Sequence, residues 1–404
     1  MESNWKKNII LFITGQAITF LGSMVVQYAI LWHITLTTQS GLMMTLFSII
    51  GFFPMFFISP FGGVWADRYN RKKIINISDG IIALVSLIVA ILLIFGHTHF
   101  IILLVCAAVR ALGQGVQTPA VGAVIPQIVP KEHLTKINGI NSSIQSICSL
   151  VAPMLGGIIM NYTSLQIIFF IDVVTAIIGI SILVFFVKVP NLEKIKTDIK
   201  VGYFHELMEG LRYIKNHGFV FRLIVFCGIF SIFAAPAFLL SPLQVVRNFG
   251  DDVWRLSATQ VASSIGMIFG GILIAIWGGF KNKTYTLALS CFIFGLSSIG
   301  LGIMSNFIIY VGIMVFAGII MPLFDTPSTV MLQATVEQEY MGRVFSVSTM
   351  VSTATMPLAM ILFGPLADII NINIIFIITG ILIAFSSLYL LLNNTLREAG
   401  NVNI

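Results

Sequence analysis

The chain has 404 residues, of which 57% are hydrophobic and only 9% are charged, and its mean hydropathy is +1.00. A soluble domain carries about 25% charged residues, because charges keep a folded surface in water. The surplus apolar surface of this chain must therefore meet lipid, which excludes a soluble globular protein.

Apolar segments long enough to cross a bilayer follow one another along the whole chain. A membrane-spanning helix needs about 20 mostly apolar residues, whereas a strand of a membrane barrel alternates apolar and polar side chains. These segments are continuously apolar, so they predict an all-α integral membrane protein. We expect twelve transmembrane helices, near residues 8–35, 41–66, 74–95, 99–125, 137–161, 165–187, 220–246, 258–278, 284–304, 307–331, 344–367 and 372–392.

The basic residues predict the orientation of these spans. The chain has 22 Lys and Arg residues against 16 Asp and Glu, a net charge of +6. With a cytoplasmic N-terminus, only Arg247 and Arg255 fall outside and only Arg110 lies within a span; every other Lys and Arg is on the cytoplasmic side. This is the positive-inside pattern. We therefore expect a multi-pass protein of the cell membrane with both termini in the cytoplasm, and no nucleic-acid partner.

The two halves of the chain resemble each other. Gln117–Ala120 in the fourth span matches Asp325–Ser328 in the tenth, and Pro153 in the fifth matches Pro357 in the eleventh. Such matches predict a parallel repeat of six spans, which is a common plan of transporters. The expected domains are an N-terminal six-helix bundle (1–187), a cytoplasmic connector with an amphipathic helix at Tyr203–Asn216 (188–219), a C-terminal six-helix bundle (220–392) and a cytoplasmic tail (393–404).

The segment between the second and third spans, Gly62 to Lys73, carries the most specific motif, GGVWADRYNRKK. A glycine, three residues, Asp-Arg, two residues and a basic cluster resemble the signature loop of the major facilitator superfamily. Asn70 replaces the usual second glycine, and Asn is a suitable substitute in a left-handed turn. The matching positions are Gly63, Asp67, Arg68, Arg71 and Lys72.

The resemblance implies that this loop is a conformational latch between the two halves. Asp67 would then face the N-terminus of the eleventh span, near Gly342 and Arg343. A helix N-terminus attracts an anion, so the arrangement is physically coherent. The alternative is that the basic residues only anchor the topology.

Charged residues within the spans are candidates for proton coupling. Arg110 lies in RALGQG, which is similar to the arginine motif in the fourth span of proton-driven members of this superfamily. An arginine inside the bilayer should face a polar interior or a partner acid. Asp172 and Asp325 are the expected proton carriers, with a purely structural pair as the alternative, whereas Asp79 is expected to pair with the basic loop.

Two further patterns concern transport. Ala152 to Gly157 resembles the antiporter motif of exporters, carried by Pro153, Gly156 and Gly157; ordinary helix packing is the alternative. In the first span, Gln16, Ser23 and Gln27 are spaced to share one helix face. Phe20 and Met24 lie nearby, and such a face suits a large amphipathic substrate; these residues could equally serve packing. The five substrate-binding candidates are Gln16, Phe20, Ser23, Met24 and Gln27.

The resemblance to the major facilitator superfamily covers essentially the whole chain, and the DRYNRKK loop and Tyr340–Ser346 are most similar to its bacterial macrolide-efflux branch. It implies proton-coupled efflux of hydrophobic drugs by alternating access, with macrolides as the leading candidate. The expected partners are a small hydrophobic or amphipathic substrate, protons and the lipid bilayer, and the protein would act as a monomer, alone or with other resistance proteins.

The sequence contains no phosphate-binding loop, metal-ligand spacing or catalytic constellation, so we expect no enzyme activity, no metal and no cofactor. Two alternatives stay open. One is an exporter of a physiological solute such as a lysolipid, siderophore or peptide. The other is a non-transporting membrane sensor of the same fold.

Overall fold

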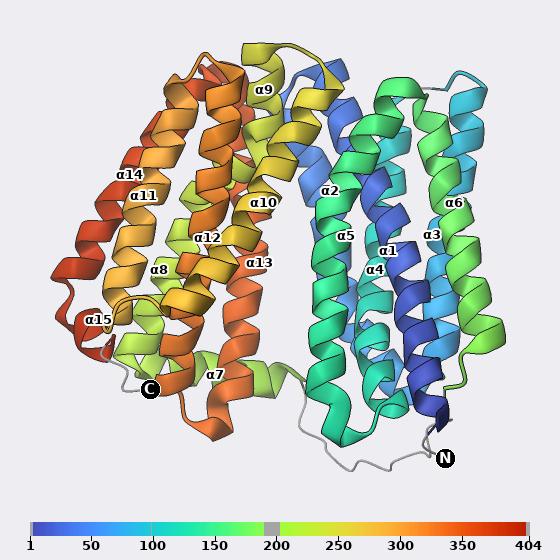
Figure 1. The fold of residues 1–404 in the computed structure, drawn as a ribbon, viewed down its shortest axis with the longest axis horizontal. Coiled ribbons are helices and arrows are strands. Elements are labelled where there is room, and N and C mark those ends of the chain that lie inside the picture. Colours follow the sequence, from blue (N-terminus) through green and yellow to red (C-terminus); the bar gives the residue numbers. More distant parts are fainter. Residues whose placement is uncertain (1–2, 98, 190–202, 401–404) are drawn as a thin grey trace. The chain divides into compact units, whose positions relative to one another are not determined.

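The computed structural model describes residues 3–97, 99–189 and 203–400, and among these residues it contains helices and no strand (Figure 1). The elements of the first half are α1 (Ser3–Thr38), α2 (Gly41–Arg68), α3 (Arg71–Ile94), α4 (Phe100–Ile128), the 3-10 turn η1 (Lys131–His133), α5 (Leu134–Tyr162), α6 (Leu165–Ser181) and the π-helical turn η2 (Ile182–Phe186).

The second half begins at the connector helix and contains a second π-helical turn. Its elements are α7 (Tyr203–Asn216), α8 (Gly218–Ala235), the π turn η3 (Pro236–Leu240), α9 (Ser241–Phe249), α10 (Val253–Trp277), α11 (Lys283–Ile303), α12 (Phe307–Thr335), α13 (Gln338–Ile369), α14 (Ile372–Leu392) and α15 (Asn394–Ala399). Helix α7 has the bounds predicted for the amphipathic helix. Most of the preceding connector, residues 190–202, lies outside the described residues.

Twelve helical segments of the described chain are long and apolar enough to cross a membrane, which confirms the predicted number. Ten of them are single α-helices. The sixth span combines α6 with η2, and the seventh combines α8, η3 and α9. The seventh span changes to a π turn at Pro236, where proline removes a backbone donor from the helical ladder.

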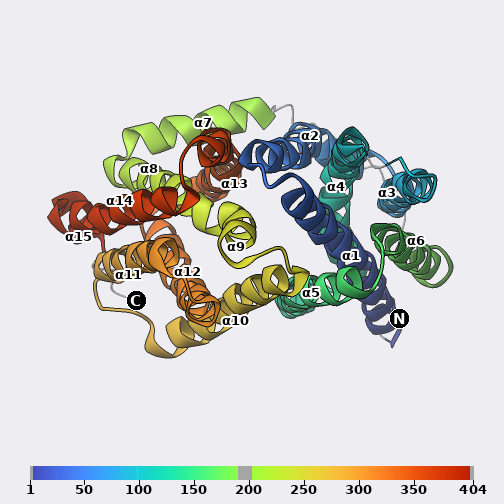
Figure 2. The same ribbon diagram turned by 90° about the horizontal axis from the view of Figure 1, so that it is seen from above.

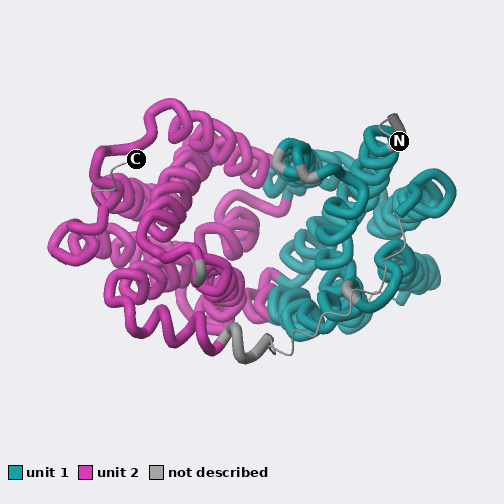
Figure 3. The backbone as a smooth tube through the Cα atoms, turned by 90° about the horizontal axis from the view of Figure 1, so that it is seen from below, with its two compact units in different colours: residues 1–38, 46–197, 252–257 teal, residues 39–45, 198–251, 258–404 magenta. Residues whose placement is uncertain are grey.

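The chain forms two compact units, drawn in separate colours in Figure 3. Unit 1 consists of residues 1–38, 46–197 and 252–257, and unit 2 of residues 39–45, 198–251 and 258–404. The boundary between the units lies in the connector and also at the start of two helices. The first turn of α2 belongs to unit 2, and the first turn of α10 belongs to unit 1. These two turns start the second span of each predicted repeat.

Unit 1 is built on α1, which packs against α5 and α6, and on α3, which packs against α4 and α6 (Figure 2). Small residues let the helices approach closely, as is usual in membrane bundles. A Cβ on Gly22 of α1 would lie 2.0 Å from Oγ1 of Thr175 in α6. At one end of the unit, Phe12, Ile75, Ile125 and other apolar side chains from α1, α3 and α4 form a buried cluster.

Unit 2 contains closely packed helix pairs of its own, α11 with α14 and α11 with α12. The end of the chain also belongs to this core. Leu396 of α15 is fully buried, Nδ2 of Asn282 donates to the carbonyl of Arg397 (2.7 Å), and Oγ1 of Thr284 donates to that of Leu396 (2.6 Å). The segment predicted as a cytoplasmic tail therefore includes a short helix that holds the start of α11.

Gly270→Ala should lower the melting temperature of the protein, because the new Cβ would lie 2.1 Å from the carbonyl oxygen of Ile319 in α12. Overpacking of this kind typically costs about 1–3 kcal/mol. The neighbouring Gly271→Ala is the matched control, since its Cβ would meet no described atom within 4 Å. Thermal unfolding of the two purified variants checks the prediction, and equal melting temperatures would contradict the close packing of α10 on α12.

Candidate functional site

A buried ion pair lies at the centre of unit 1. Arg110 of α4 donates through Nη1 to Oδ2 of Asp172 in α6, and the two side chains are 4% and 1% exposed. Oγ of Ser86 in α3 lies 2.6 Å from Nη1 of Arg110 and donates to Oδ2 of Asp172 (2.7 Å). Ser23 of α1 completes the group, since its Oγ donates to Oδ1 of Asp172 (3.3 Å) and its carbonyl accepts from Nη2 of Arg110 (3.2 Å).

This group links four helices and leaves neither charge unmatched. An isolated charge inside a bilayer is costly, and pairing it with an opposite charge and hydrogen bonds removes most of that cost. The expectation that Arg110 faces a partner acid is confirmed. Ser23, which was expected to contact substrate, is instead buried in this network.

A small pocket about the size of one water molecule opens beside Arg110 in unit 1. Gln27, Phe47, Arg110 and Gln114 are among the residues that line it. Of the five side chains expected to bind substrate, the structure thus places Ser23 within the ion-pair network and Gln27 in the lining of this pocket. Phe20 and Met24 are half-buried on the same helix.

Four phenylalanines of α2 form an aromatic cluster that the sequence analysis did not single out. Phe52, Phe53, Phe56 and Phe57 contact one another with ring centroids 5.5–6.0 Å apart. The first three are half-buried and Phe57 is exposed. Their spacing, in pairs about one helical turn apart, could have predicted this cluster from the sequence. It is not specific, because helices that face lipid carry phenylalanines as well.

A second buried polar group of unit 1 contains Asp79, whose pairing was predicted wrongly. Asp79 is 1% exposed, and its Oδ1 accepts from Nε2 of Gln117 in α4 (2.6 Å) rather than from the basic loop. Nε2 of Gln117 also lies 3.5 Å from Oε1 of Gln16 in α1. Oδ2 of Asp79 is buried without a hydrogen-bond partner among the described residues.

The basic residues after α2 bind helix ends within unit 1. Arg71 donates through Nε to the carbonyl of Ala66 (2.8 Å) and through Nη1 to that of Ala123 in α4 (2.7 Å). Lys72 donates through Nζ to the carbonyls of Val184 and Val187 (3.0 and 2.8 Å), where the π turn η2 ends the sixth span. Cations at helix C-termini are favourable, because the carbonyls there carry partial negative charge.

The other members of the predicted latch are described only in part. Gly63 is half-buried in α2 with open space around its Cα, and Arg68 is exposed. The side chain of Asp67 lies outside the described residues, so its contact with the eleventh span stays a prediction. In unit 2, Nη1 of Arg343 at the start of α13 pairs with Oε2 of Glu209 in α7 (3.1 Å). The connector helix thus supplies a partner for Arg343 that the sequence analysis did not foresee.

The motif expected of exporters contacts the first turn of α10 within unit 1. The carbonyl of Pro153 accepts from Oγ of Ser257 (2.8 Å). A Cβ on Gly157 would lie 2.6 Å from Cβ of Ser257, whereas Gly156 faces Trp32 and Tyr28 at 3.6–3.9 Å. Gly157 therefore leaves the space that Ser257 occupies at the start of α10, and the carbonyl of Pro153 binds its hydroxyl.

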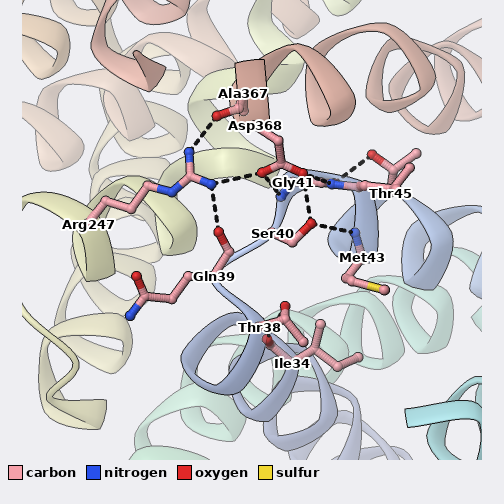
Figure 4. A network of polar contacts seen from close by, with 11 residues as sticks. Ile34, Thr38, Gln39, Ser40, Gly41, Met43, Thr45, Arg247, Ala367 and Asp368 are labelled. Atoms are coloured by element: carbon pink, nitrogen blue, oxygen red, sulfur yellow. Dashed lines mark hydrogen bonds and ion pairs between the residues drawn. The ribbon is translucent and has the colours of Figure 1, made fainter. Parts of the chain in front are cut away.

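A dense network in unit 2 binds the first turn of α2 (Figure 4). Asp368 near the end of α13 accepts from the backbone N–H groups of Gly41 and Leu42 (2.7 and 2.9 Å) and from Oγ of Ser40 (2.7 Å). Arg247 of α9 pairs with Asp368 (2.8 Å) and donates to the carbonyls of Gln39 and Ala367. Asp368 therefore caps the N-terminus of α2, where free N–H groups attract an anion.

The remaining candidate for proton coupling, Asp325, lies in unit 2. It sits in α12 between Pro322 and Pro327, and its side chain is exposed on the surface of that unit. The structure therefore brings Arg110 and Asp172 together and places Asp325 apart from them.

Twelve spans in two helical units, with charges held inside one bundle, define a multi-pass membrane transporter. Residues 10–359 match the family model of the Major Facilitator Superfamily, and the chain belongs to this family. It is 29% identical over 398 residues to Macrolide efflux protein A of Streptococcus pyogenes, covering 98% of each chain. This confirms the resemblance to the macrolide-efflux branch.

Two other similarities are more distant. The chain is 23% identical over 400 residues to the Staphyloferrin A transporter of Staphylococcus aureus, covering 96% of each chain. Its fold is similar to the crystal structure of a bacterial homologue of the human lysosomal transporter Spinster in an inward-facing, unoccupied conformation. That match has a TM-score of 0.71 at 13% identity and covers 100% of this chain and 98% of the other.

Arg110→Met should destabilise unit 1 strongly, because it leaves the carboxylate of Asp172 buried without its counter-charge, a change that costs about 3–5 kcal/mol. The double variant Arg110→Met/Asp172→Leu should regain most of that stability, since apolar residues can replace a whole buried pair. Melting temperatures in detergent test both statements. A double variant as unstable as the single one would show that the ion pair does not organise the bundle. Asp252→Asn, which breaks an exposed pair with Arg255, is the control and should cost under about 1 kcal/mol.

Proposed function

We propose that this transporter exports hydrophobic drugs from the bacterial cell, with macrolides as the leading candidate. The observation that carries the proposal is the similarity to Macrolide efflux protein A, which extends over 98% of both chains. A match of this length includes all twelve spans and both units. The positive-inside distribution of Lys and Arg supports a plasma-membrane protein with both termini in the cytoplasm.

The proposed drug contacts lie on the half-buried surfaces of unit 1. Gln27 of α1 and Gln114 of α4 line the pocket together with Phe47 of α2. Phe20 and Met24 lie half-buried on α1, the helix that carries Gln27. Aromatic and methionine side chains adapt to large apolar ligands, and a few amides fix their orientation. A bulky amphipathic drug would have to open this pocket, which is about the size of one water molecule in this structure.

We propose that the proton gradient drives export, since each charge moved is worth about 2.3 kcal/mol per 100 mV. Arg110, Asp172 and Asp325 remain the candidates named from the sequence. The pairing of Arg110 with Asp172 supports a role in which protonation of the acid would free the arginine. Asp325 is exposed on the surface of unit 2, where a proton can exchange with it.

We further propose that the two units alternate access to the substrate site. The network around Asp368 supports this mechanism, because it binds the first turn of α2 into unit 2 while residues 46–68 belong to unit 1. A movement of one unit relative to the other must bend α2 at this boundary or release Asp368. We assign this network as a gate on the outer face and the DRYNRKK loop as the latch on the cytoplasmic face.

Locking the outer gate should stop transport. Ser40→Cys/Asp368→Cys places two thiols where Oγ of Ser40 and Oδ2 of Asp368 are 2.7 Å apart. Oxidation or a short thiol cross-linker should abolish drug efflux, and reduction of the disulfide should restore it. Each single cysteine variant treated in the same way is the control. Full transport by the cross-linked protein would show that release of Asp368 is not required and would leave bending of α2 as the movement.

The proposed activity is tested in a pump-deficient host that expresses the protein. Macrolide accumulation should fall relative to cells with an empty vector, and an uncoupler should return it to the control level. Unchanged accumulation of every macrolide and dye in a broad panel would exclude drug efflux. Persistence of the efflux in the presence of the uncoupler would exclude proton coupling.

The similarity to the Staphyloferrin A transporter favours siderophore export as the second candidate. A siderophore is polar and carries carboxylate or other iron-binding oxygens, so it would need a more cationic site than a macrolide does. Release of siderophore into the medium, with no change in macrolide accumulation, would favour this function over drug efflux.

A further inference from the structure

Asp79 of α3 is a buried carboxyl group that the proposed coupling residues do not include. It is 1% exposed, and its Oδ1 accepts from Nε2 of Gln117 (2.6 Å). The helices are tight at this level, because a Cβ on Gly113 of α4 would lie 2.7 Å from Cγ1 of Ile82 and 3.5 Å from the carbonyl of Ser78. The carboxyl group is therefore enclosed between α3 and α4.

Two acceptor oxygens on this part of α3 lack a donor. Oδ2 of Asp79 and Oδ1 of Asn76 are both buried without a hydrogen-bond partner among the described residues. Residues three apart on a helix share a face, with Cβ atoms about 5–6 Å apart. Buried acceptors are normally satisfied, and each that is not costs about 1–3 kcal/mol. The same missing element, a donor or a positive charge, would satisfy both.

The described surroundings supply no counter-charge for Asp79. Helix α3 packs against α4, α6 and the turn η2. From α4, Arg110 is already paired with Asp172, and Arg71 and Lys72 at the start of α3 bind helix-end carbonyls. From α6, the charged group that acts on Asp79 is Asp172, which has the same sign. The turn η2 contains only apolar residues.

We propose that Asp79 is a proton-binding site of the transporter, with Asn76 and Gln117 as its positioning residues. An ionised carboxylate only accepts hydrogen bonds, whereas a protonated one also donates. A proton on Oδ2 supplies the donor that this face of α3 lacks and removes an unpaired charge from the bilayer interior. Gln117 holds the other oxygen, and Asn76 lies one turn earlier on the same face of α3.

This assignment deepens the proton-driven export proposed above and rests on it for its role in transport. Loading the proton gives Oδ2 of Asp79 a hydrogen to donate, and releasing it restores a buried acceptor without a donor among the described residues. Gln117 also reaches Oε1 of Gln16 in α1 (3.5 Å), and Gln16 is one of the predicted substrate contacts. The proton site and the substrate face are therefore joined by one amide side chain.

Asp79→Asn is the informative substitution. The amide keeps the shape of the side chain and carries a permanent donor in place of the proton, so the variant should fold and melt no lower than the wild type. It should retain exchange of labelled for unlabelled drug across proteoliposomes, which needs no net proton movement, and lose accumulation driven by a pH gradient. Asp251→Asn, at an exposed position between α9 and α10, is the matched control and should retain both activities.

Infrared difference spectra of the purified protein in lipid test proton binding independently of transport. The wild type should show the C=O stretch of a protonated carboxylic acid, Asp79→Asn should lose it, and Asp251→Asn should keep it. Carboxylic-acid bands that are identical in the wild type and in Asp79→Asn, or gradient-driven accumulation by that variant, would overturn the assignment. Loss of the band on adding Na⁺ at constant pH would identify a sodium site and overturn it equally.

The experiments distinguish failure of the proton site at Asp79 from failure of the proposed proton-driven export. Wild-type efflux that is insensitive to the proton gradient, together with an Asp79-dependent carboxylic-acid band, would remove the proposed energy source and leave the proton site in place. Gradient-driven efflux in the wild type and in Asp79→Asn alike would keep the energy source and remove Asp79 from the coupling pathway.

Discussion

Unit 1 depends on the buried ion pair between Arg110 and Asp172. Lipid cannot solvate either charge, so α4 and α6 must turn these side chains toward each other and away from the bilayer. Ser86 and the backbone and hydroxyl of Ser23 satisfy the remaining hydrogen-bonding capacity. One pair therefore fixes the inward faces of four helices, which apolar packing alone would leave free to rotate, because lipid and protein interiors are almost equally apolar.

Unit 2 orients the inward faces of its helices with neutral polar groups in place of an ion pair. Oη of Tyr310 donates to Oε1 of Gln244, and Nε2 of Gln244 donates to the carbonyl of Leu301 and to Oδ1 of Asn373, each at 2.9 Å. This buried network links α9, α11, α12 and α14 without a charge. The two repeats thus share a plan but differ in electrostatics: in the described residues, the acids buried within a helix bundle, Asp79 and Asp172, both belong to unit 1. The buried carboxyl groups proposed to bind protons therefore lie in unit 1, whereas the remaining candidate, Asp325, is exposed in unit 2.

Much of the fold could be predicted from the sequence, because the bilayer constrains each span separately. Length and hydropathy determine the twelve spans, and the spacing of apolar residues predicted α7 at its observed bounds. The packed helix α15 was missed, since its one deeply buried residue, Leu396, leaves no periodic pattern in six residues. The exchange of the first turns of α2 and α10 between the units depends on tertiary contacts that no local pattern encodes.

The types of residue in the candidate site could be predicted from the sequence. Which of these residues contact each other was harder to predict. An arginine within a span implies a nearby acid, but the sequence did not decide between Asp172 and other acids. Proximity along the chain suggested that Asp79 pairs with the basic loop, yet Arg71 and Lys72 bind the carbonyls at helix ends, which are invisible in a sequence. The partners of Arg343 and Ser257 likewise come from helices distant in the chain.

The central claim is that this single chain couples the entry of protons to the exit of a hydrophobic drug. Its most direct test uses purified protein in liposomes with an imposed pH gradient, no nucleotide and a labelled macrolide. The drug should accumulate against its concentration gradient on the acidic side and leak back when an ionophore collapses the pH difference. Accumulation that ignores the gradient, or no movement of any macrolide, would contradict it.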